Sequence, residues 1–268
     1  MPEAEVKKGR NKDSVANTLV VAVSLSLVAS ILVATAAIFL QPIQKKNEEL
    51  FRQKIILDVA GLYAPGVDVN ALFSGIETRM VDLATGEYSD EVAASEFDAI
   101  AAAKDPDTGI SIPPKTDIAN IRQRARLAPV YQVRDGGEVT QIILPIYGTG
   151  LWSTMFGFLS LDPDGTTILG LRFYEHAETP GLGDQIDKPD WRAQWAGKQV
   201  FAGDDQPRIE VIRGFVDENS AAAIHQVDGI SGATLTGRGV TNLVQYWTGP
   251  HGFGPYLSRI RTEGSGDD

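Results

Sequence analysis

The sequence predicts an α+β fold, in which one N-terminal transmembrane helix is followed by a single domain with a mainly antiparallel sheet flanked by helices. Three observations support it: an uncharged apolar run over residues 15–40, two pairs of alternating strands between residues 129 and 176, and an apolar helical pattern over 235–247. Strands joined by tight turns pair antiparallel. Because no long flexible linker or internal repeat interrupts residues 50–261, we expect one domain, over residues 41–268.

The first element is the uncharged run, which is 26 residues long. As a helix it measures about 39 Å, more than the roughly 30 Å of a bilayer's hydrocarbon core, so it can span with some tilt. An Ala-x-Ala triplet at 34–36 has the form of a signal-peptide cleavage site. The apolar core of a signal peptide is only about 7–15 residues long, however, and here apolar residues continue beyond the triplet. We therefore predict an uncleaved single-pass anchor after a tail of residues 1–14.

The flanking charges leave the orientation of this anchor open. Four basic residues precede it, and four more follow within fifteen residues of its end. Basic residues mark the cytoplasmic side and acidic residues matter little, so the count is a tie.

Composition excludes several classes of function. The net charge is −11, and because residues 1–14 carry +1 and 15–50 carry zero, the remainder carries −12. An acidic body lacks the clustered Lys and Arg that nucleic acids require, so we predict no nucleic-acid partner. The absence of cysteine excludes disulfides and thiolate ligands. The three histidines show no ligand spacing, and we predict no metal site.

The first elements of the domain follow from periodicity and turn residues. Residues 47–63 form a predicted stalk helix that continues from the anchor and docks on the body, with one apolar face: Leu50, Phe51, Ile55, Val59 and Leu62. Residues 76–88 read as a strand and turn, and 89–104 as a helix capped by Ser89 or Asp90. Residues 105–114 read as a loop.

The strands come next in the chain. Alternating runs over 129–148 surround Gly136-Gly137, and those over 155–176 surround a Pro-Asp-Gly turn, which predicts two hairpins. A Gly/Pro loop, a short helix over 189–197 and a strand around 208–213 follow. The apolar pattern over 235–247 closes the domain as a helix.

The stretch "DGISGATLT" (228–236) places three hydroxyls, Ser231, Thr234 and Thr236, among small residues before that helix. One interpretation is capping by Ser231 or Thr234. The other is a phosphate site, because a helix N-terminus offers free N–H groups and partial positive charge, and Gly232 and Ala233 add no bulk. The patterns of a phosphate-binding P-loop and of a serine-hydrolase elbow are both missing.

The same stretch resembles D-x-x-S-G-A-T, the flavinylation motif of FMN-binding domains, in which the final Thr is esterified to the phosphate of FMN. Residues 150–183, the N-terminal anchor and the tail "GFGPYL" are similar to the C subunit of the Na⁺-translocating NADH:quinone reductases. The resemblance covers nearly all of the chain. It implies a covalent FMN, attached to Thr234 through a phosphoester.

The resemblance also implies a set of cofactor-binding residues. Ser231, Gly232 and Ala233 would surround the phosphate, and Asp228 would be the acidic residue of the motif, with a part in the attachment step and not in electron transfer. The loop "HAETPGLG" matches a second family motif and would lie against the flavin ring, with Trp152 at its border. The implied ring contacts in that loop are Glu178, Thr179, Gly181, Leu182 and Gly183. No acid–base or nucleophilic catalytic residue is implied.

The implied function is that of a membrane-anchored electron carrier in a Na⁺-pumping NADH:quinone oxidoreductase. Electrons would arrive from NADH through other subunits and leave toward a flavin of the B subunit and ubiquinone. A separate flavin transferase, using FAD and Mg²⁺, would attach the FMN. The domain would lie on the periplasmic side of a bacterial inner membrane. Alternatives are the G subunit of the Rnf-type ferredoxin:NAD⁺ oxidoreductases, a membrane-anchored FMN-domain regulator, and a serine-type hydrolase, for which no candidate base is evident.

Overall fold

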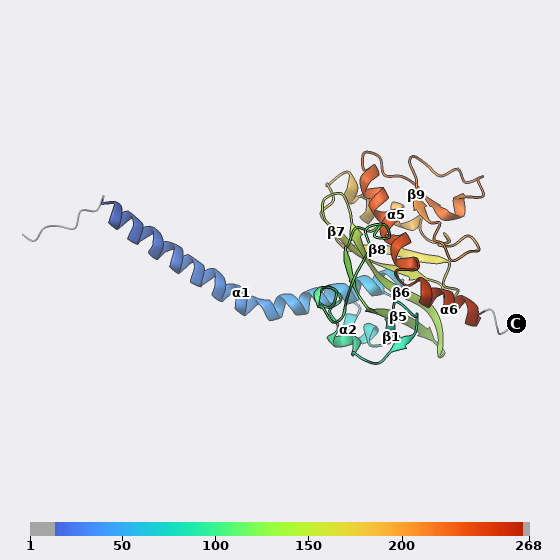
Figure 1. Cartoon of the computed structure of the whole chain (residues 1–268), viewed down its shortest axis with the longest axis horizontal. Coiled ribbons are helices and arrows are strands. Elements are labelled where there is room, and N and C mark those ends of the chain that lie inside the picture. Colours follow the sequence, from blue (N-terminus) through green and yellow to red (C-terminus); the bar gives the residue numbers. More distant parts are fainter. Residues whose placement is uncertain (1–13, 265–268) are drawn as a thin grey trace, which may run out of the picture. The chain divides into compact units, whose positions relative to one another are not determined.

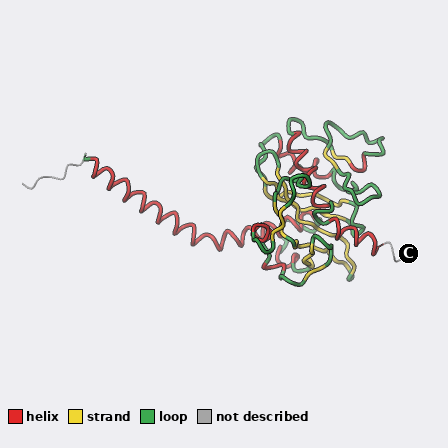
Figure 2. The backbone as a smooth tube through the Cα atoms, in the orientation of Figure 1, coloured by secondary structure: helices red, strands yellow, loops and turns green. Residues whose placement is uncertain are grey.

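A computed structural model describes residues 14–264 and separates the chain into two compact units, one ending at Phe51 and one beginning at Arg52 (Figure 1). All of the predicted N-terminal tail except Ser14 lies outside the described residues. Figure 2 shows the helical character of the first unit and the mixed strands and helices of the second.

The helix α1 (Val15–Val59) contains the whole predicted span and continues through Pro42. It is long and apolar enough to cross a membrane: one 18-residue window has a mean hydropathy of 2.5, and none of it is buried. The predicted stalk is the last part of this same helix, but it ends at Val59 and not near residue 63. The Leu62 N–H donates to the Leu57 carbonyl (2.9 Å) beyond Gly61 at φ +71°, which is a common helix ending.

Within the second unit, the end of α1 is buried through four apolar side chains: Ile55, Ile56, Leu57 and Val59. Burial of the predicted apolar face is therefore confirmed for Ile55 and Val59. It is wrong for Phe51 and Leu62, which are exposed. Leu62 lies past the helix end, so it does not share the helical face.

The second unit is built on one antiparallel sheet with the strand order β2-β1-β5-β6-β7-β8. Both predicted hairpins are confirmed, β5–β6 around Gly136-Gly137 and β7–β8 around the Pro-Asp-Gly turn. The strands are β1 (Ile76–Asp82), β2 (Tyr88–Ser89), β5 (Leu127–Asp135), β6 (Glu138–Thr149), β7 (Thr154–Leu161) and β8 (Ile168–Glu175).

An apolar core lies on each face of this sheet. Successive side chains of a strand point to opposite sides, so neighbouring apolar residues enter different cores. Along β6, Ile142 and Leu144 enter a large core that includes side chains of α5 (Thr234–Thr248) and α6 (Gly254–Gly264). Ile143 enters a smaller core with the end of α1 and α2 (Val69–Phe73). Helices thus cover each face, as the predicted fold class requires.

The segment between β2 and β5 differs from the prediction. Instead of one helix over 89–104 there are a 3₁₀ turn, η1 (Ala94–Glu96), and a short helix, α3 (Ala99–Lys104). Asp98 caps α3 by accepting hydrogen bonds from the N–H groups of Ile100 and Ala101 (both 3.0 Å), whereas Ser89 pairs with Met80 in the sheet. The predicted loop over 105–114 contains β3 (Gly109–Ser111), which pairs with β4 (Gln123–Ala125).

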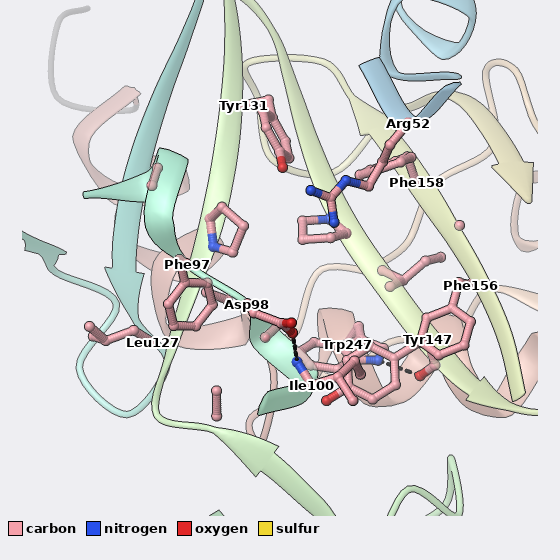
Figure 3. A pocket seen from close by; sticks show the side chains of 18 of the residues that line it. Arg52, Phe97, Asp98, Ile100, Leu127, Tyr131, Tyr147, Phe156, Phe158 and Trp247 are labelled. Carbon is pink, nitrogen blue, oxygen red and sulfur yellow. Dashed lines mark hydrogen bonds between the residues drawn. The ribbon is translucent and has the colours of Figure 1, made fainter. Parts of the chain in front are cut away.

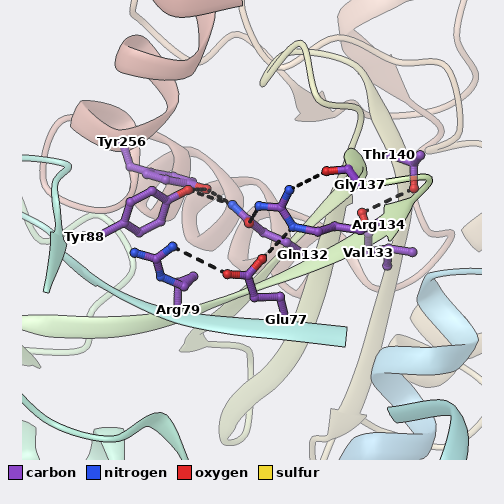
Figure 4. A network of polar contacts seen from close by, with 9 residues as sticks. All are labelled: Glu77, Arg79, Tyr88, Gln132, Val133, Arg134, Gly137, Thr140 and Tyr256. Carbon is purple, nitrogen blue, oxygen red and sulfur yellow. Dashed lines mark hydrogen bonds and ion pairs between the residues drawn. The ribbon is translucent and has the colours of Figure 1, made fainter. Parts of the chain in front are cut away.

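The C-terminal part supplies the elements around the motif. They are η2 (Gly183–Asp187), α4 (Pro189–Ala193), β9 (Glu210–Val211), η3 (Ala223–His225), β10 (Gln226–Val227), α5 and α6. The sequence predicted α4, β9 and α5 but not α6. A polar network fastens α6 to the sheet: Gln132 Nε2 donates to the hydroxyls of Tyr256 (3.1 Å) and Tyr88 (2.7 Å) (Figure 4).

Tyr246 of α5 is expected to make the folded protein less stable as the pH becomes alkaline. Burial raises the pKa of Tyr246 to about 12, against about 10 in an unfolded chain. Between these values the unfolded state loses a proton that the folded state keeps, so the free energy of unfolding should fall as pH rises from about 9.5 to 12. Denaturant titrations of the wild type and Tyr246→Phe should give a smaller fall in the variant. Equal falls would exclude Tyr246 as a cause.

Candidate functional site

The motif loop before α5 is held in place by Asp228. Its Oδ1 accepts a hydrogen bond from the Val216 N–H (2.7 Å), and its own N–H donates to Gln194 Oε1 (3.0 Å). Its carbonyl accepts from Trp191 Nε1 (3.0 Å). Two other segments, residues 191–194 and Val216, therefore hold Asp228, and its side chain shapes the loop that leads to the hydroxyls.

Thr234 is the first residue of α5, and its side chain is exposed. The N-cap position is Ala233, which makes no side-chain cap hydrogen bond. The capping interpretation of Ser231 and Thr234 is therefore wrong, and the first N–H groups of a 15-residue helix lack a side-chain cap. An anion beside Thr234 would be favoured by those groups and by the helix dipole.

Gly232 gives the loop its shape. Its φ is +76°, a conformation that suits glycine, and a Cβ there would lie only 2.9 Å from Leu182 Cδ2. The close approach brings the two sequence motifs together: Leu182, from the "ETPGLG" loop, packs on the loop that carries Ser231 and Thr234. Ser231 itself is exposed.

A cavity of about 470 Å³ lies beside Thr234. It is bordered on one side by residues of the motif and of α5, and on the other by residues 210–215. Two exposed cations, Arg213 and Arg238, line it, and neither forms an ion pair within residues 14–264. Sequence reasoning missed both. Arg238 follows Thr234 by four positions, the spacing that puts two side chains on one helix face, whereas nothing local links Arg213 to the motif.

The predicted contacts of the flavin ring lie in two segments, the turn before β7 and the "ETPGLG" loop. Trp152 Nε1 donates to Thr179 Oγ1 (2.9 Å), which joins the turn before β7 to the "ETPGLG" loop. Trp152 and Leu182 are exposed by 68% and 43%, and Leu182 lies against Gly232 of the motif loop. Gly181 is exposed, whereas Gly183 is buried at the start of η2.

Glu178 and Thr236 lie beneath this surface. The Glu178 side chain is 4% exposed, and Thr236, which the sequence left without a role, is fully buried. Thr236 Oγ1 donates a short hydrogen bond to Glu178 Oε2. Glu178 Oε1 accepts from the N–H groups of Leu151 (2.8 Å) and Trp152 (3.3 Å).

A second cavity, of about 110 Å³, is lined by aliphatic side chains and several aromatic rings, with Arg52 and Tyr131 directed toward it (Figure 3). A cavity of about 150 Å³ is known to hold one benzene molecule. The second cavity is therefore too small for a tricyclic flavin ring. The 470 Å³ cavity at Thr234, with its two arginines and uncapped helix, fits a bulky phosphate-bearing ligand far better.

The fold and the site define a class, that of FMN-binding proteins with an apolar N-terminal helix: residues 150–249 match the FMN-binding domain family. The chain belongs, more narrowly, to the family of the C subunit of the Na⁺-translocating NADH-quinone reductases. It is 47% identical to that subunit of Haemophilus ducreyi, over 94% of this chain and 96% of the relative. The corresponding Pseudomonas aeruginosa protein is 45% identical, over 94% of this chain and 98% of that relative.

Solved structures agree with this assignment. The crystal structure of Shewanella oneidensis NqrC gives a TM-score of 0.73 at 36% identity, over 82% of this chain and 99% of that chain. The crystal structure of the C subunit from Parabacteroides distasonis gives a TM-score of 0.62 at 26% identity, over 82% of this chain and 96% of that chain. The predicted fold class and family are confirmed.

Proposed function

We propose that this chain is the electron-carrier subunit of a Na⁺-translocating NADH:quinone reductase and holds FMN through a phosphoester to Thr234 Oγ1. One observation carries the proposal: an exposed hydroxyl stands at the uncapped N-terminus of α5, beside a 470 Å³ cavity lined by two arginines. The family match of residues 150–249 supports FMN as the ligand. Bound FMN supplies reversible acceptance of electrons, and the protein supplies its attachment and orientation.

Each part of the site has a task in this proposal. The N–H groups at the start of α5 and the guanidinium groups of Arg213 and Arg238 stabilise the phosphate. Gly232 and Ala233 keep the approach to Thr234 free of bulk. The apolar area of Trp152 and Leu182 borders the ring, and Thr179, Gly181, Gly183, Glu178 and Ser231 complete the predicted contacts.

Attachment requires a donor and a second protein. With FAD as donor, Thr234 Oγ1 forms a bond to the phosphorus next to the flavin ribityl chain, the hydroxyl proton leaves, and AMP departs. A flavin transferase with Mg²⁺ would perform this step. Asp228 would contribute by holding the motif loop through its bond to Val216.

The chain would work within a complex in a bacterial inner membrane. Its relatives are named as the C subunit of a reductase, so other subunits are the expected partners. The apolar α1 supports a single membrane anchor. In this proposal the domain lies on the periplasmic side, as the family resemblance implies. Membership of the C-subunit family favours this assignment over the G subunit of an Rnf-type enzyme and over an FMN-domain regulator.

The direct test is to find the adduct. The chain is co-expressed with its flavin transferase, and denaturing gels are inspected for flavin fluorescence at its band. Intact mass should exceed that of the unmodified chain by one FMN less one water. A non-fluorescent band of unmodified mass, from cells in which another substrate of the transferase is flavinylated, would refute covalent attachment.

Leu182→Ala should separate attachment from ring contact. The variant keeps Thr234 and the phosphate site, so we expect full flavinylation. The lost apolar contact exposes the ring to water, which should shift the flavin midpoint potential measured by spectroelectrochemical titration. A fully flavinylated variant with an unchanged midpoint would remove Leu182 from the ring contacts.

A further inference from the structure

Glu178 is a buried carboxylate at the junction of three segments of the site. Its side chain is 4% exposed, which is rare for glutamate unless its oxygens are well paired. Its partners come from the turn before β7, through Leu151 and Trp152, and from the first turn of α5, through Thr236. Glu178 itself belongs to the "ETPGLG" loop. All three segments border the proposed FMN site, and none is adjacent to another in sequence.

The hydrogen bonds suit an ionised carboxylate. Two backbone N–H groups and one hydroxyl point at its two oxygens, and an ionised carboxylate can only accept. The neighbouring His176 is engaged elsewhere: its Nδ1 faces the Glu178 N–H (3.2 Å), and its Nε2 lies 2.8 Å from Asp187 Oδ2. Among residues 14–264, no Lys or Arg forms an ion pair with Glu178.

Close packing fixes the position of this charge. A Cβ added at Gly183 would lie 2.7 Å from Thr236 Oγ1 and 2.8 Å from Glu178 Oε2. Glycine at that position therefore lets the backbone of the "ETPGLG" loop approach the Glu178–Thr236 pair. Thr236 is only two residues after Thr234, so the carboxylate is tied directly to the helix turn that carries the attachment hydroxyl.

We infer that Glu178 is a positioning residue of the flavin site, whose buried carboxylate fixes the ring-side loops on α5 and, by its unneutralised charge, lowers the reduction potential of the bound FMN. A nearby negative charge opposes the addition of electrons, and its effect is large where water is excluded. This inference rests on the proposed attachment of FMN to Thr234.

The Glu178→Gln variant distinguishes the effect of the Glu178 charge from the effect of its hydrogen bonds. Its amide oxygen can accept from Leu151 and Trp152, and its NH₂ can donate to the Thr236 hydroxyl, which can also accept. The variant therefore keeps the three contacts and loses only the charge. Glu175→Gln is the matched control, because Glu175 is exposed at the end of β8 and its charge is screened by water and salt.

A second pair of variants tests the positioning role. Thr236→Val has nearly the shape of threonine but cannot donate to Glu178, whereas Thr236→Ser can. Loss of this bond should increase amide hydrogen exchange at Leu151 and Trp152, in the flavin-free as well as the flavinylated protein. Thr236→Ser should restore the wild-type exchange.

The experiment is a redox titration of the flavinylated full-length variants with amide exchange measured in parallel. We expect Glu178→Gln to shift the two-electron reduction equilibrium at least tenfold toward the reduced form, about 30 mV, with Glu175→Gln unchanged. A flavinylated Glu178→Gln with the wild-type midpoint would overturn the inference, as would unchanged exchange in Thr236→Val. A wild type without the adduct would refute the attachment at Thr234 instead, and the intact mass separates the two cases.

Discussion

Thr234→Ala is expected to abolish covalent FMN completely when the chain is co-expressed with its transferase. The proposed bond is made by Thr234 Oγ1, and alanine has no oxygen to replace it. The free energy of unfolding should change by no more than about 0.5 kcal/mol, because the side chain is exposed and does not cap α5. Intact mass and in-gel fluorescence give the adduct, and urea denaturation gives the stability.

Two controls accompany this variant. Thr234→Ser keeps a hydroxyl at the same position and should retain at least part of the adduct. Ser231→Ala removes the exposed hydroxyl of the preceding loop and should be flavinylated. An adduct that persists in Thr234→Ala would show that another residue carries the flavin, and peptide mass mapping would locate it.

Trp195→Ala should lower the free energy of unfolding by about 3–5 kcal/mol, the usual cost of deleting a buried aromatic side chain. Trp195 is fully buried and packs edge-on against Trp191, with ring centroids 5.7 Å apart. The effect should reach the site, because Trp191 Nε1 donates to the carbonyl of Asp228 at the start of the motif. We expect weaker flavinylation as well as lower stability in denaturant titrations.

Trp195→Phe is the control for this prediction. The indole Nε1 of Trp195 is buried and has no hydrogen-bond partner among the described residues, so phenylalanine removes no such bond. Its cost should be well below that of alanine. If the two variants were equally unstable, or if Trp195→Ala lost less than about 1 kcal/mol, Trp195 would not be a main support of this core.

Local signals were enough to predict the larger elements. The uncharged run, the two hairpin turns and the amphipathic pattern of α5 each depend on residues that are neighbours in sequence. The failures lie where long-range contacts decide. Ser89 pairs with Met80 of β1 and does not start a helix, and Tyr256 of α6 is held by Gln132, 124 residues away. No periodicity within a short window contains such information.

The residues of the candidate site also fall into two groups, those that sequence motifs predicted and those that only the fold brings to the site. The motif and the family resemblance predicted Thr234 and the "ETPGLG" loop as site residues, and the packing of Leu182 on Gly232 brings the two segments together. The Glu178–Thr236 bond joins residues 58 apart, so the buried role of Thr236 needed the fold. The same holds for Arg213, which reaches the cavity from a segment that carries no motif of its own.

The exposure of Thr234 allows the proposed attachment of FMN to take place after the domain has folded. Its hydroxyl is at the surface of a helix whose other face is packed into the core, and the loop before it takes its shape from the bonds of Asp228. A transferase could thus reach its target on the folded domain and would not need to unfold it. Flavin-free chains would then be folded substrates of the transferase.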